Sequence, residues 1–136
     1  MFKYDKVVFM NAGVEAVETA MKFARRWGYI NKKIPDNQAR IIWATGNFHG
    51  RTISVIGGSD EEDRYRQFGP FVPNNIIVEY NNIEALEKEI VNKNNCAFIV
   101  EPIQGEAGVI IPDAGYLTKV RELCTKNNVL LICDEI

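Results

Sequence analysis

Short apolar runs alternate with longer amphipathic stretches along this chain, and this alternation limits the fold more than any other feature. The apolar runs are continuous and rich in β-branched residues, which is typical of strands buried on both faces of a parallel sheet. They lie at residues 6–10, 40–44, 76–78, 96–100 and 129–133. The pattern therefore predicts a three-layer α/β/α fold, in which a mostly parallel sheet lies between two layers of helices.

The stretches between these runs have helical spacing. After the first run, apolar residues recur at the 3.6-residue period, at Val14, Val17, Met21, Ala24 and Trp27. Asn82 is a typical N-cap for a second helix, and residues 116–126 predict a third. Residues 57–73 are charged and aromatic, which indicates a surface excursion that either folds back on its own domain or contacts another subunit.

Composition excludes several classes of protein. The chain has 136 residues, of which 46% are hydrophobic, and a net charge of -2, which disfavours nucleic acid as a partner. No apolar run approaches the length of a membrane span, and no signal segment is recognisable. The three cysteines, an odd number, predict buried thiols in a reducing compartment without a disulfide framework, and His49 is the only histidine, so no zinc site is expected.

In parallel α/β sheets, ligands bind beyond the carboxyl ends of the strands. The first segment to inspect is the turn that leads into the first helix, at Gly13 and Val14. Free backbone N–H groups at such a helix start attract anions. The alternative is a simple turn in which Gly13 permits close packing.

The second segment is Gly46–Arg51, which we call the aromatic turn. Phe48 is either a core residue or a platform for a ligand, and Arg51 either a surface ion-pair partner or a carboxylate clamp. His49 has no nucleophile or carboxylate in motif spacing, which disfavours a general base. The flanking glycines indicate a backbone pressed close to another part of the molecule.

Residues with carboxylate side chains directly follow two further predicted strands. Asp134 follows buried aliphatic residues and needs a partner, either a structural cation or a cationic ligand atom. Glu101 and Glu106 lie on either side of a short turn and are either paired carboxylates for acid–base chemistry or solvated loop residues.

Four motifs in order carry a family resemblance: residues 10–18 (MNAGVEAVE), 46–52 (GNFHGRT), 101–108 (EPIQGEAG) and 134–136 (DEI). Together they resemble the class III pyridoxal-phosphate-dependent aminotransferases, and among these the members that use ornithine as amino donor are most similar. The resemblance covers nearly the whole chain. It implies that residues 1–136 are part of the cofactor-binding large domain of a fold-type I pyridoxal 5'-phosphate (PLP) enzyme.

The resemblance also implies roles for individual residues. Gly13 and Val14 would bind the cofactor phosphate, Phe48 would stack on the pyridine ring, and Asp134 would pair with the protonated ring nitrogen. Arg51 would bind a substrate carboxylate. Glu106 would pair with a distant arginine and help the site admit two substrates in turn.

The sequence departs from the family pattern in several ways. Ala12 replaces a threonine or serine that would bind phosphate, and His49 replaces the tryptophan of the animal ornithine enzymes. The catalytic Schiff-base lysine is absent from this chain and is expected beyond Ile136. An N-terminal segment and a C-terminal small domain are also expected elsewhere, so the 136 residues alone should be inactive.

The resemblance implies transamination from ornithine to 2-oxoglutarate, giving glutamate 5-semialdehyde and glutamate, in a full-length homodimer. One alternative is another class III aminotransferase that uses acetylornithine or 4-aminobutyrate. Another is a non-catalytic phosphate-binding or protein-contact domain. We expect small amino-acid and 2-oxo-acid ligands, no nucleic acid, membrane or metal partner, and a cytoplasmic location, with the mitochondrial matrix as the alternative.

Overall fold

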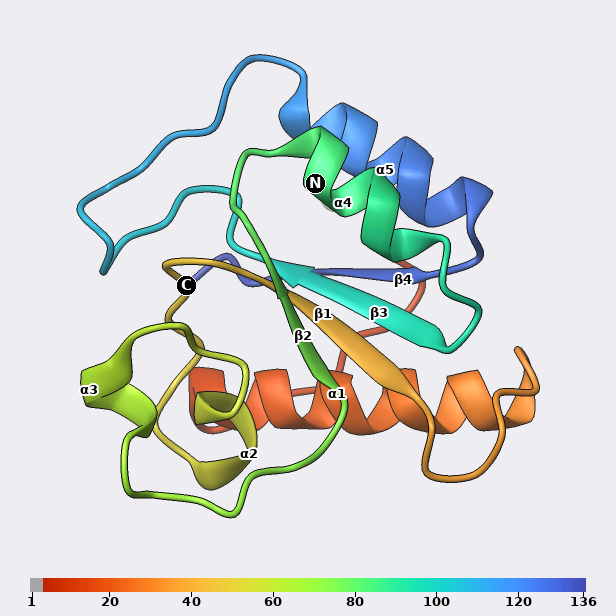
Figure 1. The fold of residues 1–136 in the computed structure, drawn as a ribbon, viewed down its shortest axis with the longest axis horizontal. Coiled ribbons are helices and arrows are strands. Elements are labelled where there is room, and N and C mark those ends of the chain that lie inside the picture. The colour runs from red at the N-terminus through yellow and green to blue at the C-terminus, as the bar shows by residue number, and fades with distance from the viewer. Residues whose placement is uncertain (1–3) are drawn as a thin grey trace.

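The computed structural model describes residues 4–136 and contains a four-stranded parallel sheet in the order β2-β1-β3-β4. Figure 1 shows the sheet between two layers of helices, as the sequence predicted. The strands are β1 (Arg40–Ala44), β2 (Asn75–Val78), β3 (Asn95–Val100) and β4 (Leu130–Cys133). The helices are α1 (Gly13–Ile30), α2 (Ile53–Ile56), α3 (Glu62–Tyr65), α4 (Ile83–Ile90) and α5 (Tyr116–Lys126).

Alternating side chains of the central strands form two separate cores. Ile41 and Trp43 of β1 face α1 and α2, where Val17 and Met21 pack in the same cluster. Ile42 and Ala44 point to the opposite face, which α4 and α5 cover (Figure 1). Because both faces of β1 and β3 are covered, residues 41–44 and 96–100 are apolar without interruption.

Helix α4 begins where the sequence predicted, because the Asn82 side chain accepts a hydrogen bond from the Ala85 N–H at 2.9 Å. Residues 57–73 form a largely exposed excursion that contains α3, but it also folds back on its own domain. Gly58 and Ser59 are buried, and Phe71 packs against the core on the α1 side of the sheet.

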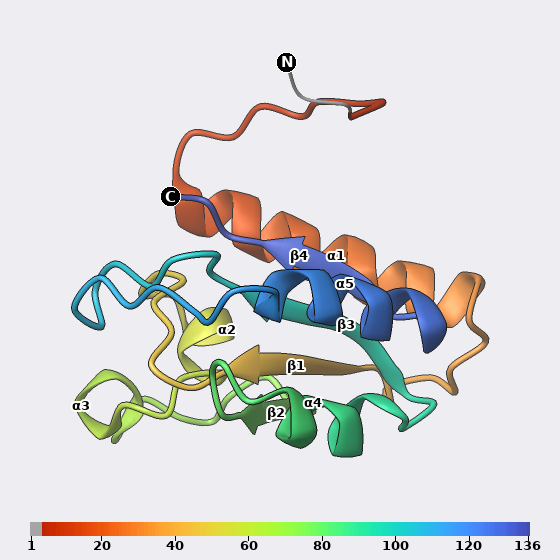
Figure 2. The same cartoon turned by 90° about the horizontal axis from the view of Figure 1, so that it is seen from above.

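The predicted strand at residues 6–10 is wrong. The segment is irregular, and Val7 and Phe9 are 70% and 91% exposed. In Figure 2 it runs from the start of α1 away from the sheet. A β-strand needs a neighbour to accept its backbone hydrogen bonds, and none of the strands in residues 4–136 pairs with it.

One cysteine also differs from expectation. Cys96 and Cys124 are buried, as predicted, and burial raises the pKa of each thiol to about 11. Cys133 is exposed instead. It is the last residue of β4, a strand at the edge of the sheet, so the apolar run around it is covered less than the runs of the central strands.

Candidate active site

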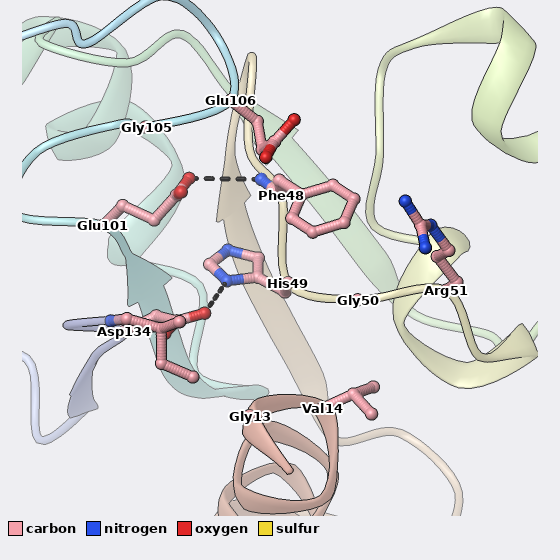
Figure 3. Close-up of a pocket in the computed structure, with 11 residues that line it drawn as sticks. Gly13, Val14, Phe48, His49, Gly50, Arg51, Glu101, Gly105, Glu106 and Asp134 are labelled. Atoms are coloured by element: carbon pink, nitrogen blue, oxygen red, sulfur yellow. Dashed lines mark hydrogen bonds and ion pairs between the residues drawn. The ribbon is translucent and has the colours of Figure 1, made fainter.

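A cavity of about 470 Å³ opens at the carboxyl ends of β1, β3 and β4, beside the start of α1. Figure 3 shows side chains from these separate segments turned toward one space. The six residues to which the family resemblance gives a role all line this cavity. The full lining is Gly13, Val14, Phe48, His49, Gly50, Arg51, Glu101, Gly105, Glu106, Asp134 and Ile136.

The start of α1 forms one wall of the cavity. Ala12 is extended, with φ -140° and ψ 156°, and its side chain does not cap the helix. It also has no hydroxyl that could bind a phosphate. The Glu15 carboxylate instead accepts hydrogen bonds from the N–H groups of Asn11 and Ala12, at 2.8 and 3.1 Å. The N–H groups of Gly13 and Val14 have no carbonyl partner within the helix, so this wall offers donors and a partial positive charge to an anion.

The aromatic turn, Gly46–Arg51, forms an adjoining wall and is tied firmly to the sheet. The Asn47 amide donates to the carbonyl oxygens of Ala44 and Gly58, at 2.6 and 2.9 Å. Gly50 has φ +122°, and a Cβ there would collide with the Val14 side chain. The predicted close approach at Gly50 is therefore confirmed, and it presses the turn against α1.

His49 and Asp134 form a buried pair at the base of the cavity. The His49 Nδ1 lies 2.8 Å from the Asp134 Oδ2, and the two side chains are 1% and 7% exposed (Figure 3). The other ring nitrogen, Nε2, is buried without a hydrogen-bond partner among residues 4–136. Asp134 thus has a structural partner, and within residues 4–136 its outer oxygen accepts a hydrogen bond only from the Ile136 N–H, at 3.3 Å.

Glu101 has a role that sequence analysis did not identify. It is 7% exposed, and its Oε2 accepts a hydrogen bond from the Phe48 N–H at 3.2 Å. Burial raises the pKa of this carboxyl, and the Phe48 N–H partly opposes that effect. Glu106 is exposed, and no hydrogen bond or ion pair joins the two carboxylates in the described part of the chain. The structure therefore does not support the pairing of Glu101 with Glu106.

Arg51 lies at the mouth of the cavity. Its guanidinium carbon is 5.8 Å from the centre of the Phe48 ring, and it forms no ion pair with any residue from 4 to 136. Arg51 and Glu106 also line an adjoining cavity of about 420 Å³. The surface ion pair considered for Arg51 is thus absent from the described residues, and its donors are available to a carboxylate.

The sequence signals for the missed contacts were weak. His49 and Asp134 are 85 residues apart, and neither spacing nor periodicity links them. Asn47 and His49 alternate with Phe48, which indicates an extended turn with two buried side chains, but the identity of their partners depends on the fold. Among residues 4–136, no cluster of side chains suits a metal ion, and no helix is long and apolar enough to cross a membrane.

The arrangement suits a planar, anionic ligand with a basic ring atom. Donors at the start of α1 face an anion, Phe48 offers an aromatic face, and Asp134 can accept a proton-bearing nitrogen. Arg51 can bind a second, carboxylate-bearing molecule at the mouth.

Comparison with known proteins agrees with this chemistry. The chain is 58% identical to the mitochondrial ornithine aminotransferase of Drosophila melanogaster over 136 residues, all of this chain and 32% of that protein. It thus spans about a third of the length of this curated relative.

Two solved structures are also similar. One is an ornithine aminotransferase from Toxoplasma gondii with partial occupancy of PLP at its active site, with a TM-score of 0.95 and 47% identity over 97% of this chain and 31% of that one. The other is an acetylornithine aminotransferase from Elizabethkingia anophelis, with a TM-score of 0.74 and 50% identity over 93% of this chain and 30% of that one. The family described as Aminotransferase class-III matches residues 1–136. The chain therefore belongs to the class III aminotransferase family.

Proposed function

We propose that the full-length protein is a PLP-dependent aminotransferase that converts ornithine and 2-oxoglutarate to glutamate 5-semialdehyde and glutamate. The observation that carries the proposal is one cavity in which the start of α1, Phe48 and the Asp134 carboxylate meet. The named relatives from Drosophila and Toxoplasma support ornithine as the donor. In this proposal, residues 1–136 are the cofactor-binding part of a large domain.

The residues of the cavity fit PLP. The N–H groups of Gly13 and Val14 would receive the phosphate, and Gly13 has no side chain to cover them. Phe48 would lie against the pyridine ring. When bound, PLP supplies an electron sink for the carbanion that forms at the donor carbon.

Asp134 would hold the proton on the ring nitrogen. Opposite charges about 4 Å apart attract by about 4 kcal/mol at an effective dielectric constant of 20, before the cost of desolvation. His49 contributes by donating a hydrogen bond from Nδ1 to Oδ2 of Asp134, which fixes the carboxylate plane. The remaining oxygen of Asp134 would then be left to accept the proton-bearing ring nitrogen.

Two exposed residues at the mouth of the cavity, Arg51 and Glu106, would take part in substrate binding. Arg51 would bind a substrate carboxylate through its planar guanidinium, which has no competing ion pair among residues 4–136. Glu106 would pair with an arginine outside residues 1–136 and so help the site admit ornithine and 2-oxoglutarate in turn.

A donor panel tests the proposal on the full-length protein with PLP. We expect ornithine to give a kcat/KM at least tenfold above that of acetylornithine and 4-aminobutyrate, a preference worth about 1.4 kcal/mol. A preference for acetylornithine would favour the second candidate, which the 50% identity to the Elizabethkingia enzyme supports. PLP binding without turnover of any donor would favour a non-catalytic domain, and residues 1–136 alone should show no turnover.

We also propose that the protein is a homodimer and that it is cytoplasmic, with the mitochondrial matrix as the alternative because the Drosophila relative is named mitochondrial. The excursion at residues 57–73 supports a subunit contact, since Phe68 is 54% exposed there. Analytical ultracentrifugation of the full-length protein should give twice the chain mass. A monomer at micromolar concentration would contradict the dimer.

A further inference from the structure

Arg64 is not among the residues that we expect to bind PLP or substrate, yet its side chain reaches from α3 to the aromatic turn. Its guanidinium is half-buried and forms no ion pair within the described residues. Instead, its Nη1 donates a hydrogen bond to the Asn47 carbonyl oxygen, and its central carbon lies 5.1 Å from the centre of the Phe48 ring. The ring distance is within the range of a cation–π contact.

The peptide between Asn47 and Phe48 is therefore held at both ends by charged groups. Its carbonyl oxygen accepts from the Arg64 cation, and its N–H donates to the Glu101 carboxylate at 3.2 Å. This order matches the peptide dipole, whose oxygen is negative and whose N–H is positive. The positive charge of Arg64 also lowers the pKa of Glu101, against the larger effect of burial.

The residue ahead of Phe48 is fixed as well. The buried Asn47 side chain donates to two carbonyl oxygens, so the backbone cannot rotate toward solvent without breaking these bonds. Since the plane of the Asn47–Phe48 peptide sets the direction of the Phe48 Cα–Cβ bond, whatever holds that peptide also orients the ring.

We propose that Arg64 is a positioning residue, which orients the Phe48 ring by holding the Asn47 carbonyl and lying against the ring. The inference deepens the proposed function, because Phe48 is the ring that we expect to stack on PLP. Arg66 offers a matched control: it lies two residues further along, is exposed, and among the described residues forms an ion pair only with Glu62, at 3.3 Å.

The first test uses the full-length apoprotein and so does not depend on PLP. In Arg64→Met, we expect amide hydrogen exchange at Phe48 to become about tenfold faster, as for the loss of one charge-assisted hydrogen bond. Arg64→Lys keeps a cationic donor and should restore most of the protection. Arg66→Met should match the wild type.

The second test uses the holoenzyme and reports on the ring itself. Arg64→Met should reduce the visible circular dichroism per bound PLP and raise the PLP dissociation constant about tenfold, with partial rescue by Arg64→Lys. Wild-type exchange and dichroism in Arg64→Met, or equal changes in Arg66→Met, would overturn the inference. If Arg64→Met does not fold, Arg64→Gln takes its place: reduced dichroism in Arg64→Gln with at least partial recovery in Arg64→Lys supports the inference, and Arg64→Lys as impaired as Arg64→Gln, or wild-type dichroism in Arg64→Gln, contradicts it. Failure of the wild type to bind PLP would overturn the proposed function but leave the exchange test standing.

Discussion

Two segments that follow neighbouring strands both reach the cavity, but they are held very differently. The aromatic turn, Gly46–Arg51, is fixed by Asn47, by Glu101 and by the bond from the Gly46 N–H to Asp60 at 2.8 Å. The second segment, residues 103–111, which we call the arm, is anchored at its base by the buried Gln104, whose amide donates to the Thr45 carbonyl oxygen at 2.8 Å, and is closed by the Gln104–Ile110 bridge. Its aliphatic side chains are exposed: Ile103 52%, Val109 68%, Ile110 42% and Ile111 69%.

The difference matches the two tasks of the proposed enzyme. The rigid turn carries Phe48, which would contact a cofactor that stays in place. The arm carries Glu106, which would respond to two substrates that bind in turn. A segment with few buried contacts can change conformation at a small cost in free energy. Substitutions in the two segments test this contrast.

Gly50→Ala should destabilise the full-length protein by about 3 kcal/mol, because it adds backbone strain to a collision with Val14. Gly105→Ala, in the arm, is the matched control: a Cβ there would meet nothing within 4 Å, so we expect a change below about 0.5 kcal/mol. Urea unfolding monitored by fluorescence measures both. Equal losses of stability would mean that the arm is as tightly packed as the turn.

Asn47→Ala should destabilise the protein by about 2 kcal/mol, since two carbonyl oxygens lose their donor in a buried site. Ile111→Ala removes an exposed side chain from the arm and should change stability by less than about 0.5 kcal/mol. Urea unfolding measures the change in stability of both variants. A loss at Ile111 as large as that at Asn47 would show that the arm is covered in the full-length protein.

Glu101→Gln tests the point where the two segments meet. Burial raises the pKa of Glu101 above its ordinary value of 4.5, so its contribution to stability is complete below pH 4.5 and is lost as the pH rises through the folded-state pKa. Glutamine stays neutral and can still accept from the Phe48 N–H. The variant should therefore match the wild type below pH 4.5 and gain stability relative to it as the pH rises. Unfolding free energies measured from pH 4 to 8 give this difference, and the opposite slope would contradict it.

Much of this fold could be predicted from the sequence because periodicity reports burial. The run at 96–100 is apolar throughout and forms β3, and the spacing from Tyr116 to Lys126 is helical over the full length of α5. The run at 6–10 is also mostly apolar but forms no strand, since pairing depends on a neighbour and not on the segment itself.

The site was predictable to the extent that strand ends converge. That rule brought Phe48, Arg51, Glu106 and Asp134 to one edge of the sheet. It could not reveal the His49–Asp134 pair or the Arg64 contact, because both depend on how side chains from distant loops meet in space.

In the proposed enzyme, the turn serves the cofactor and the arm serves the substrate. Measuring PLP dissociation constants and the KM values of both substrates, for Phe48→Leu and Glu106→Gln in the full-length enzyme, separates these two roles. Phe48→Leu should weaken PLP binding by about threefold to tenfold, the value of an aromatic contact. Glu106→Gln should leave the PLP dissociation constant within about twofold and change the ratio of the KM values for ornithine and 2-oxoglutarate. Unchanged PLP binding in Phe48→Leu, or weakened PLP binding in Glu106→Gln, would contradict the account.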